Sequence, residues 1–322
     1  MYHKVNVEGT KCVIEACQKS GVKALVYTSS ASVVSDNVSD LINADERWPV
    51  IPPSAQTEYY SQTKVSFPCF SRFSQPFSQL TNIPTQAEAE ALVLAANRAS
   101  TSPKLLTTAL RPSGIFGPGD VQVLPPMIRV YYEGKTHFQL GDNSNLFDFT
   151  YVENVAHAHI LAAAALLTTS SLNTQVLDHE KVDGETFFIT NDSPVPFWDF
   201  ARLIWRTLDL SPSSRNINKE GKREVRGTEG NWVIGKEIGL VLGTVLEWGM
   251  WLVGRKSRLT AREVKYSCMT RYYDIGKANK RLGYVPIVGL EEGVKRGVAW
   301  FEEREREEKE KVGTGLGEKK GL

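Results

Sequence analysis

The chain of 322 residues is 41% hydrophobic and 23% charged, and its 38 Lys and Arg balance 37 Asp and Glu to a formal net charge of +1. This composition excludes global disorder, and the balanced charge gives no electrostatic basis for binding nucleic acid. The cysteines form no Cys-x-x-Cys pair and have no histidines at metal-ligand spacing, so neither a disulfide framework nor a metal site is predicted.

The first elements in chain order alternate between helix and buried strand. Residues 1–20 place apolar side chains at helical spacing, and residues 23–30 form a short apolar run that ends in hydroxyl side chains. A helix over residues 87–98 and a strand over residues 105–111 follow. Helices that alternate with buried strands predict an α/β fold built on a parallel sheet.

The second half of the sequence is less regular. It combines strand-like runs near residues 148–152 and 185–190 with an alanine-rich helical stretch between them. We therefore predict a sheet domain over residues 1–120 and a smaller second part over residues 121–301. Residues 302–322 are almost wholly charged or glycine, which predicts a disordered tail.

One internal segment, residues 65–86, differs from both of its flanks. It is rich in proline and phenylalanine and has no acidic residue, and its prolines exclude a continuous helix. Without the segment, Lys64 would join Ala87 and the flanks would form one amphipathic helix. We therefore interpret residues 65–86 as a non-native insert, a translated intron whose ends are compatible with splice-site codons. The alternative is a functional lid, because loops longer than about 12–15 residues are often binding loops.

Tyr60 and Lys64 are four positions apart, and on a helix this spacing puts them on one face. A nearby ammonium group favours the phenolate and lowers the pKa of a phenol, so such a pair can transfer a proton. The spacing alone is not specific, since solvated Tyr and Lys side chains often occur four apart. Ser29 and Ser30 lie upstream at a strand end and supply a hydroxyl that could donate to the reacting oxygen.

Four motifs, in their order and approximate spacing, resemble the extended short-chain dehydrogenases and, within them, the 3β-hydroxysteroid dehydrogenase family. They are NVEGT from Asn6, VYTSSAS from Val26, YYSQTK from Tyr59 and LRPSGIFGPGD from Leu110. Two later motifs are similar to the same family, DFTYVENVAHAHILAA from Asp148 and YYDIGKANKRLGYVP from Tyr272. The resemblance covers nearly the whole chain outside residues 65–86. It implies a partial Rossmann-type parallel sheet with a smaller C-terminal substrate domain.

The resemblance also assigns catalytic roles to individual residues. Tyr60 is implied to be the catalytic acid and base, and Lys64 to lower its pKa and to hold the cofactor ribose. Ser30 is implied to orient the reacting oxygen, with the adjacent Ser29 as the alternative.

The cofactor implied by the family is NAD, with NADP as the alternative, and Asn6, Pro112 and Ile115 correspond to residues near it. Members of the family hold the pyrophosphate with a glycine-rich turn between the first strand and the first helix. The glycines from Gly114 belong to the late turn and those from Gly313 lie in the charged tail, so neither set is a credible phosphate loop. We therefore expect the chain to begin about three βα units late, roughly 90 residues at about 30 residues per unit. As given, it is expected to bind NAD(H) weakly or not at all.

Residues 232–254 form an apolar stretch that contains Trp232, Trp248 and Trp251 and is followed by basic residues. Its longest uncharged run is too short for the roughly 20 apolar residues of a transmembrane helix. Its few charges would share one face, which is typical of a helix lying in a membrane interface. A core helix of the second part is the alternative. His157 and His159, on a predicted helix, are interpreted as packing or surface residues.

The function implied by the resemblance is that of an NAD(P)-dependent oxidoreductase acting on a 3β-hydroxyl group, with oxidative decarboxylation of a 4α-carboxysterol as the expected reaction. Alternatives are a flavonol-type reductase, a nucleotide-sugar epimerase or a non-catalytic fragment. Such a sterol enzyme would lie on the cytoplasmic face of the endoplasmic reticulum membrane. No nucleic-acid partner is expected, and the sequence leaves the oligomeric state open.

Overall fold

The computed structural model describes residues 3–51, 82–99, 104–172, 174, 176–211, 232–252 and 260–313. The chain divides into two compact units. Unit 1 comprises Met1–Ser113, Glu153–Asp192 and Thr270–Ile287, and unit 2 comprises Gly114–Val152, Ser193–Met269 and Val288–Leu322. The predicted single boundary near residue 120 is therefore wrong, because the chain returns to the first unit twice.

Unit 1 contains a parallel sheet with the strand order β1-β3-β8, as the alternation of helix and strand predicts. The strands are β1 (Ala24–Thr28), β3 (Leu106–Pro112) and β8 (Thr186–Ile189). The side chains of β3 and β8 are buried, whereas most of those of β1 are only half-buried because β1 pairs with a single strand in the described part of the chain. The sequence places β8 in the second part, but its backbone pairs with β3.

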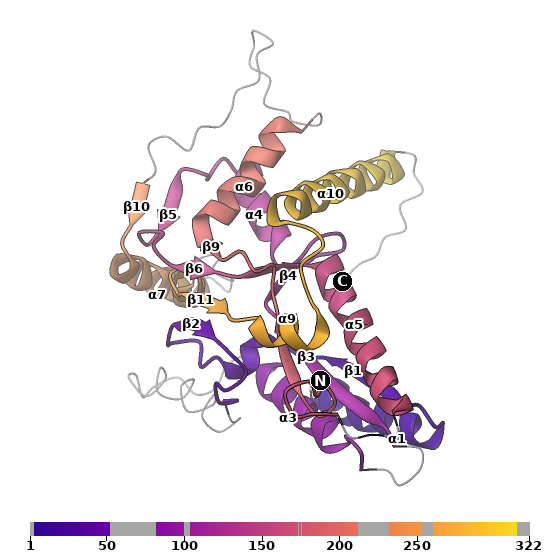
Figure 1. Cartoon of the computed structure of the whole chain (residues 1–322). Helices are drawn as coiled ribbons and strands as arrows, with labels where there is room; N and C mark the ends of the chain where they lie inside the picture. The colour runs from indigo at the N-terminus through magenta and orange to yellow at the C-terminus, as the bar shows by residue number, and fades with distance from the viewer. Residues whose placement is uncertain are drawn as a thin grey trace. The chain divides into compact units, whose positions relative to one another are not determined.

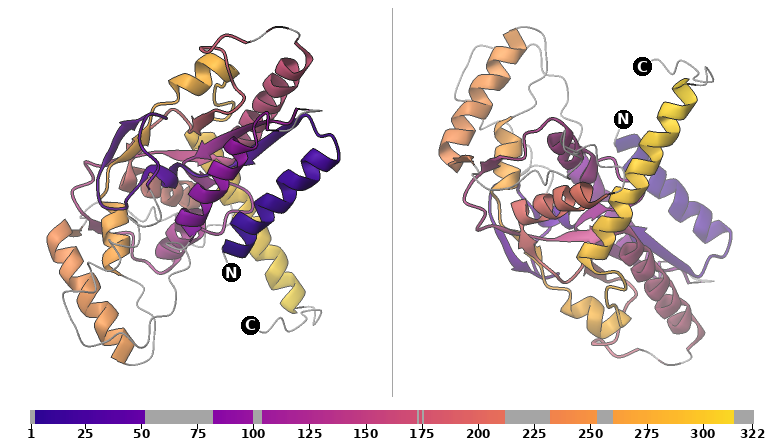
Figure 2. Two further views of the ribbon diagram at one scale, coloured as in Figure 1. Left: turned by 90° about the horizontal axis from the view of Figure 1, so that it is seen from below. Right: turned by 90° about the horizontal axis from the view of Figure 1, so that it is seen from above.

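Helices cover both faces of this sheet (Figures 1 and 2). On one face, Leu25 and Tyr27 of β1 pack with Val93 of α3 and Ile14 of α1. On the other face, Leu110 belongs to a large apolar cluster with alanines of the helix α5. The helices of unit 1 are η1 (Lys4–Glu8), α1 (Gly9–Lys19), η2 (Ala31–Val34), α3 (Asn82–Ala95), α5 (Val152–Ser171) and α9 (Gly276–Leu282).

A second strand pair in unit 1 joins early and late parts of the chain. The strand β2 (Leu41–Ala44) pairs in parallel with β11 (Arg271–Tyr273), and Phe188 of β8 stacks on Tyr273 with ring centroids 4.7 Å apart. This pairing brings β11 beside the residues that follow β1.

Unit 2 has an aromatic core. Phe149 of β7 stacks on Phe200 of α6 with ring centroids 3.7 Å apart, and Phe116 contacts both Tyr151 and Phe200. The strands are β4 (Gly114–Phe116), β5 (Phe138–Leu140), β6 (Leu146–Phe147), β7 (Phe149–Tyr151), β9 (Val195–Pro196) and β10 (Trp232–Ile234). The helices are α4 (Leu124–Tyr132), α6 (Phe197–Leu210), α7 (Lys236–Leu252), α8 (Ala261–Ser267) and α10 (Leu290–Gly313).

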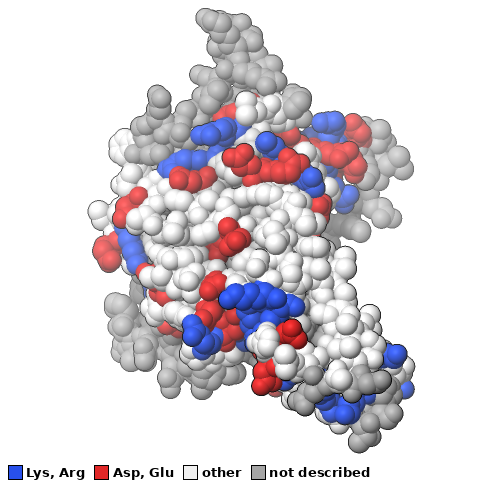
Figure 3. All heavy atoms as spheres, in the orientation of Figure 1, with Lys and Arg blue, Asp and Glu red and all other residues white. Residues whose placement is uncertain are grey.

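The helix α10 continues through most of the predicted disordered tail. Residues 302–313 are helical, and ion pairs at the i,i+4 spacing support this part of α10, including Lys309 with Glu305 at 3.0 Å. Oppositely charged side chains are interspersed along it (Figure 3). The prediction of disorder from residue 302 is thus wrong as far as Gly313, because local charge pairs stabilise a helix that buries little surface.

The helix α7 packs against α8 through two glycines. A Cβ atom at Gly243 would lie 2.7 Å from the backbone nitrogen of Ala261, and one at Gly239 would lie 3.0 Å from a methyl group of Val264. Away from this contact α7 is exposed, and six of its large apolar residues are at least 40% exposed, namely Ile238, Val241, Leu242, Val245, Leu246 and Trp248. In the described residues, no helix is both long and apolar enough to cross a membrane.

Candidate active site

Ser30 is the second residue after β1, at the carboxyl edge of the parallel sheet. Its Oγ accepts a hydrogen bond from the backbone N–H of Ser32 at 3.1 Å and so caps the short helix η2. A serine that accepts in this way still has its hydroxyl proton to donate. The accepted bond thus fixes the position of Ser30 Oγ, and the implied role of Ser30 would use its remaining proton.

Ser29 has different surroundings. Its side chain is buried, and its Oγ has no hydrogen-bond partner in the described part of the chain. Alternation along the strand puts Ser29 on the same face of the sheet as Tyr27, the face that α3 covers, and Thr28 on the other face. Of the two serines, Ser30 is the one that is only partly buried and whose hydroxyl oxygen is held by a hydrogen bond within the described part of the chain.

Two side chains of β11 hold the turn that follows Ser30. Arg271 donates from Nη2 to Ser32 Oγ at 2.9 Å and from Nε to Tyr273 Oη at 2.7 Å. The Tyr273 hydroxyl lies 3.4 Å from the carbonyl oxygen of Ala31. Sequence reasoning missed Arg271, because it lies far from Ser30 in the sequence and only the parallel pairing of β2 with β11 brings it close.

The carboxyl end of β3 carries a buried ion pair. Arg111 and Glu90, 3% and 2% exposed, form two parallel hydrogen bonds of 2.9 and 2.5 Å between the guanidinium and the carboxylate. The guanidinium also lies 5.5 Å from the ring centre of Phe188, and its Nη1 has no partner among the described residues. Sequence reasoning missed this pair too, although an arginine inside the apolar run 105–111 is a signal that could have found it.

Glu90 also acts on a neighbouring phenol. Burial raises the pKa of Tyr27, and the negative charge of Glu90 raises it further against a hydrogen bond with Thr10. Tyr27 is therefore a neutral group of the sheet face.

The other predicted site residues are dispersed. Tyr60 and Lys64 lie outside the described residues. Asn6 belongs to η1, and its Nδ2 donates to Thr85 Oγ1 at 2.9 Å. Pro112 is buried at the end of β3 in unit 1, whereas Ile115, 36% exposed, is on β4 of unit 2.

The residues at the carboxyl edge fit the nicotinamide end of a dinucleotide. In a parallel α/β sheet, ligands bind at this edge, and here Ser30 presents a held hydroxyl while the buried Ser29 Oγ has no partner among described atoms.

The glycines from Gly114 do not form a phosphate site. A Cβ at Gly117 would lie 2.8 Å from Val152, so packing explains this glycine. The N-terminus of α4 is filled by the carboxylate of Asp120, which accepts from backbone N–H groups including that of Leu124 at 2.7 Å.

The two histidines of α5 have structural roles. His157 lies against Tyr284 with ring centroids 6.3 Å apart. His159 Nε2 is 2.6 Å from Thr28 Oγ1, and its Nδ1 is 2.8 Å from the carbonyl oxygen of Val155. His159 thereby links α5 to the last residue of β1.

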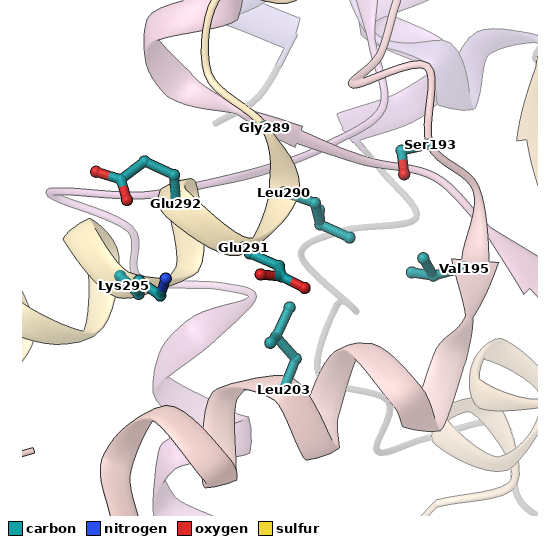
Figure 4. A pocket seen from close by; sticks show the side chains of 8 residues that line it. All are labelled: Ser193, Val195, Leu203, Gly289, Leu290, Glu291, Glu292 and Lys295. Atoms are coloured by element: carbon teal, nitrogen blue, oxygen red, sulfur yellow. The ribbon is translucent and has the colours of Figure 1, made fainter. Parts of the chain in front are cut away.

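A shallow hollow of about 480 Å³ lies in unit 2, between Leu203 of α6 and the first turn of α10 (Figure 4). Ser193, Val195 and Glu291 also line it, and none of the predicted site residues does so. Because none of these residues lines it, the hollow is assigned no part in the candidate chemistry.

The sequence profile of the 3-beta hydroxysteroid dehydrogenase/isomerase family matches residues 1–66 and 71–218. The chain is 41% identical to sterol-4-alpha-carboxylate 3-dehydrogenase, decarboxylating, of Saccharomyces cerevisiae, over 94% of this chain and 72% of that protein. The Schizosaccharomyces pombe protein of the same name is 40% identical over 94% of this chain and 73% of that protein. The human one is 33% identical over 94% of this chain and 67% of that protein.

Solved structures with lower identity share the fold. The crystal structure of gox2253 has a TM-score of 0.56 at 20% identity, covering 94% of this chain and 73% of that one. A UDP-galactose 4-epimerase has a TM-score of 0.54 at 15% identity, covering 94% and 71%. These similarities establish a Rossmann-type fold.

Proposed function

The chain belongs to the 3-beta hydroxysteroid dehydrogenase/isomerase family, and from this premise we propose that it is a sterol-4α-carboxylate 3-dehydrogenase of the decarboxylating type. The observation that carries the proposal is the identity of about two residues in five with two yeast proteins of that name, over nearly the whole chain. Membership of the family implies a nicotinamide cofactor, and we propose NAD. The nucleotide-sugar enzymes share only the fold at 15% identity, so the epimerase alternative has weaker support.

The chemistry assigned to this chain's residues is proton transfer at the 3-hydroxyl group. Ser30 donates a hydrogen bond to the reacting oxygen, Tyr60 accepts its proton, and Lys64 keeps the pKa of that phenol low. A bound nicotinamide supplies the hydride acceptor. When a carboxylate is attached at carbon 4, the 3-ketone product is a β-keto acid, which loses carbon dioxide readily because the resulting enolate is stabilised. No separate group for decarboxylation is then needed.

A turnover assay tests this proposal. We define the extended version as this chain without residues 65–86, preceded by the N-terminal βα units of the family, the first of which carries the glycine-rich turn. With NAD and a 4α-carboxysterol it should form NADH and carbon dioxide in equal amounts. NADP should be a poor substitute for NAD, and UDP-galactose should be a poor substitute for the sterol. Conversion of UDP-galactose to its 4-epimer without oxidation of the sterol would contradict the proposal.

We also propose that α7 lies on a lipid surface, on the cytoplasmic face of the endoplasmic reticulum. The outward face of α7 is apolar, Trp232 and Trp248 are exposed, and Arg255, Lys256 and Arg258 follow in the sequence. Interfacial helices combine these three features, and basic residues favour anionic lipids. The sequence predicts that the few charged residues of this stretch share one face. Glu247 instead is half-buried on the side of α7 that packs against α8. Burial and the charge of Glu263 raise its pKa. The exposed apolar face of α7 favours this lipid contact over the core-helix alternative.

Flotation with vesicles of phosphatidylcholine and phosphatidylserine tests this contact. Val241→Asp combined with Val245→Asp should reduce vesicle binding more than about tenfold, because each buried valine is worth about 1.5–3 kcal/mol. Thr244→Asp, at an exposed position on the flank of the same helix, is the matched control. Equal vesicle binding by the unmodified chain, the double valine variant and Thr244→Asp would rule out α7 as the contact.

A further inference from the structure

The helix α3 runs antiparallel to β3. Thr107 Oγ1, early in β3, donates to the carbonyl oxygen of Val93 at 2.7 Å, whereas Arg111, late in β3, pairs with the earlier residue Glu90. Residues of α3 that precede Glu90 therefore lie toward the carboxyl edge of the sheet, the edge that carries Ser30.

One helical turn before Glu90 is Gln86. It is half-buried, and the i,i+4 spacing puts it on the same face of α3 as Glu90. In this chain the first turns of α3, from Asn82 to Gln86, consist of residues from the segment 65–86. Pro84 is tolerated there because the first turn of a helix needs no N–H donor at that position.

The sequence register relates these positions to the predicted catalytic pair. If residues 65–86 are absent, Lys64 precedes Ala87 directly and takes the helical position of Gln86, four residues before Glu90. Tyr60 then takes the position of Asn82. Lys64 would then lie one turn before Glu90 and Tyr60 two turns before it, on the same face of the helix and toward the sheet edge that carries Ser30.

We propose that Glu90, held by Arg111, is the positioning residue for the helix of Tyr60 and Lys64, and that the catalytic form of this protein is the one in which Lys64 directly precedes Ala87. The proposal rests on the proposed function for the roles of Tyr60 and Lys64. In the full chain the segment 65–86 supplies the first turns of α3, so Asn82 and Gln86 occupy these two helical positions.

The energetics of the Glu90–Arg111 pair agree with a positioning role. Burying two charges costs several kcal/mol per ion, and apolar residues of similar volume often stabilise a fold equally well. A bidentate pair between helix and strand instead fixes one helical register, since the fork of the guanidinium accepts one carboxylate geometry.

Ultraviolet titration of one phenol tests the proposal without turnover or cofactor. The difference in absorbance between a protein and its Tyr60→Phe form gives the pKa of Tyr60. We expect that pKa to be about one unit or more lower after deletion of residues 65–86 than in the full chain. Lys64→Met and Glu90→Gln in the deleted chain should reverse the shift. Glu88→Gln, at an exposed position of the same helix, is the matched control and should not.

A second variant covers the case in which the deleted chain does not fold. Asn82→Tyr with Gln86→Lys in the full chain places a phenol and an ammonium group in the same two helical positions without changing the chain length. The introduced phenol should titrate about one unit or more below the same phenol with Gln86 retained. Unchanged phenol pKa values in the folded variants would overturn the proposal. If the pKa of Tyr60 falls as expected but the extended version does not oxidise the sterol, the positioning proposal is supported and the proposed function is contradicted.

Discussion

Arg271 donates a hydrogen bond from Nη2 to Ser32 Oγ at 2.9 Å, although the two residues are 239 positions apart in the sequence. Ser32 in turn donates its backbone N–H to Ser30 Oγ. A strand from the last fifth of the chain thus holds the turn that orients the predicted catalytic hydroxyl.

Replacing Arg271 by methionine should therefore affect both stability and turnover. The substitution removes hydrogen bonds from a buried cation, each worth about 1.5–3 kcal/mol, and urea unfolding should show a loss of that size. In the extended version, kcat should fall while KM for the sterol changes little, because the Ser30 turn is loosened. Tyr273→Phe, which keeps the cation, should have a smaller effect on kcat. A kcat unchanged by Arg271→Met would refute this role.

Ser30→Ala and Ser29→Ala distinguish the two candidate hydroxyls. Loss of a donor to the reacting oxygen typically costs about 10²–10³ in kcat, and we expect that loss for Ser30→Ala in the extended version. Ser29→Ala removes a buried Oγ that has no partner in the described residues, so it should leave kcat within a few fold and stability unchanged or higher. The reverse pattern of rate constants would transfer the role to Ser29.

Tyr60→Phe should lower turnover of the extended version by about 10²–10⁴, the usual contribution of general acid–base catalysis. Lys64→Ala should lower turnover and also weaken cofactor binding, which calorimetry measures separately. Tyr59→Phe, at the adjacent position, is the control for loss of a phenol. Near-normal dehydrogenation by the Tyr60→Phe protein would show that the acid–base assignment is wrong.

The ion pair of Asp183 with Arg98 predicts a pH-dependent contribution to stability. Burial by itself would raise the pKa of Asp183, but hydrogen bonds from Arg98 and Asn97 outweigh it and hold the pKa below its usual value. A carboxyl with a lowered folded pKa stabilises the fold above its unfolded pKa, about 3.9, and loses that contribution as the pH falls.

The test is Asp183→Asn, measured by urea unfolding at several pH values. At pH 7 it should lower the free energy of unfolding by about 1–3 kcal/mol, and the difference from the parent should shrink below about pH 4. Asp178→Asn, an exposed position, is the control. A difference that stays constant down to pH 2 would contradict the ionic role.

Two glycines of α7 give a matched pair of substitutions. A Cβ at Gly243 would lie 2.7 Å from the backbone nitrogen of Ala261, whereas one at Gly249 would meet nothing within 4 Å. Gly243→Ala should therefore destabilise unit 2 by about 1–3 kcal/mol through overpacking. Gly249→Ala should stabilise α7 by up to about 1 kcal/mol through helix propensity. Thermal unfolding compares them, and equal effects would show that α7 does not pack closely on α8.

Local periodicity was sufficient to predict the elements of the sheet. The strands over residues 23–30 and 105–111 and the helix over residues 87–98 occur as β1, β3 and α3 within a few residues, because burial of one face imposes a repeat that the sequence displays. The helical end of α10 was missed, although its Glu and Lys or Arg residues at i,i+4 spacing are visible in the sequence.

The sequence by itself determined the fold class, the family and the identity of Ser30, Tyr60 and Lys64 as candidate residues, because these depend on short motifs and their order. Only the tertiary structure decided that Arg271 holds the Ser30 turn, that Arg111 pairs with Glu90, and that α7 turns its apolar face outward. These features depend on strand order, helix direction and close backbone contact at glycines. Each joins residues distant in the chain, and no local repeat records which distant residue will be the partner.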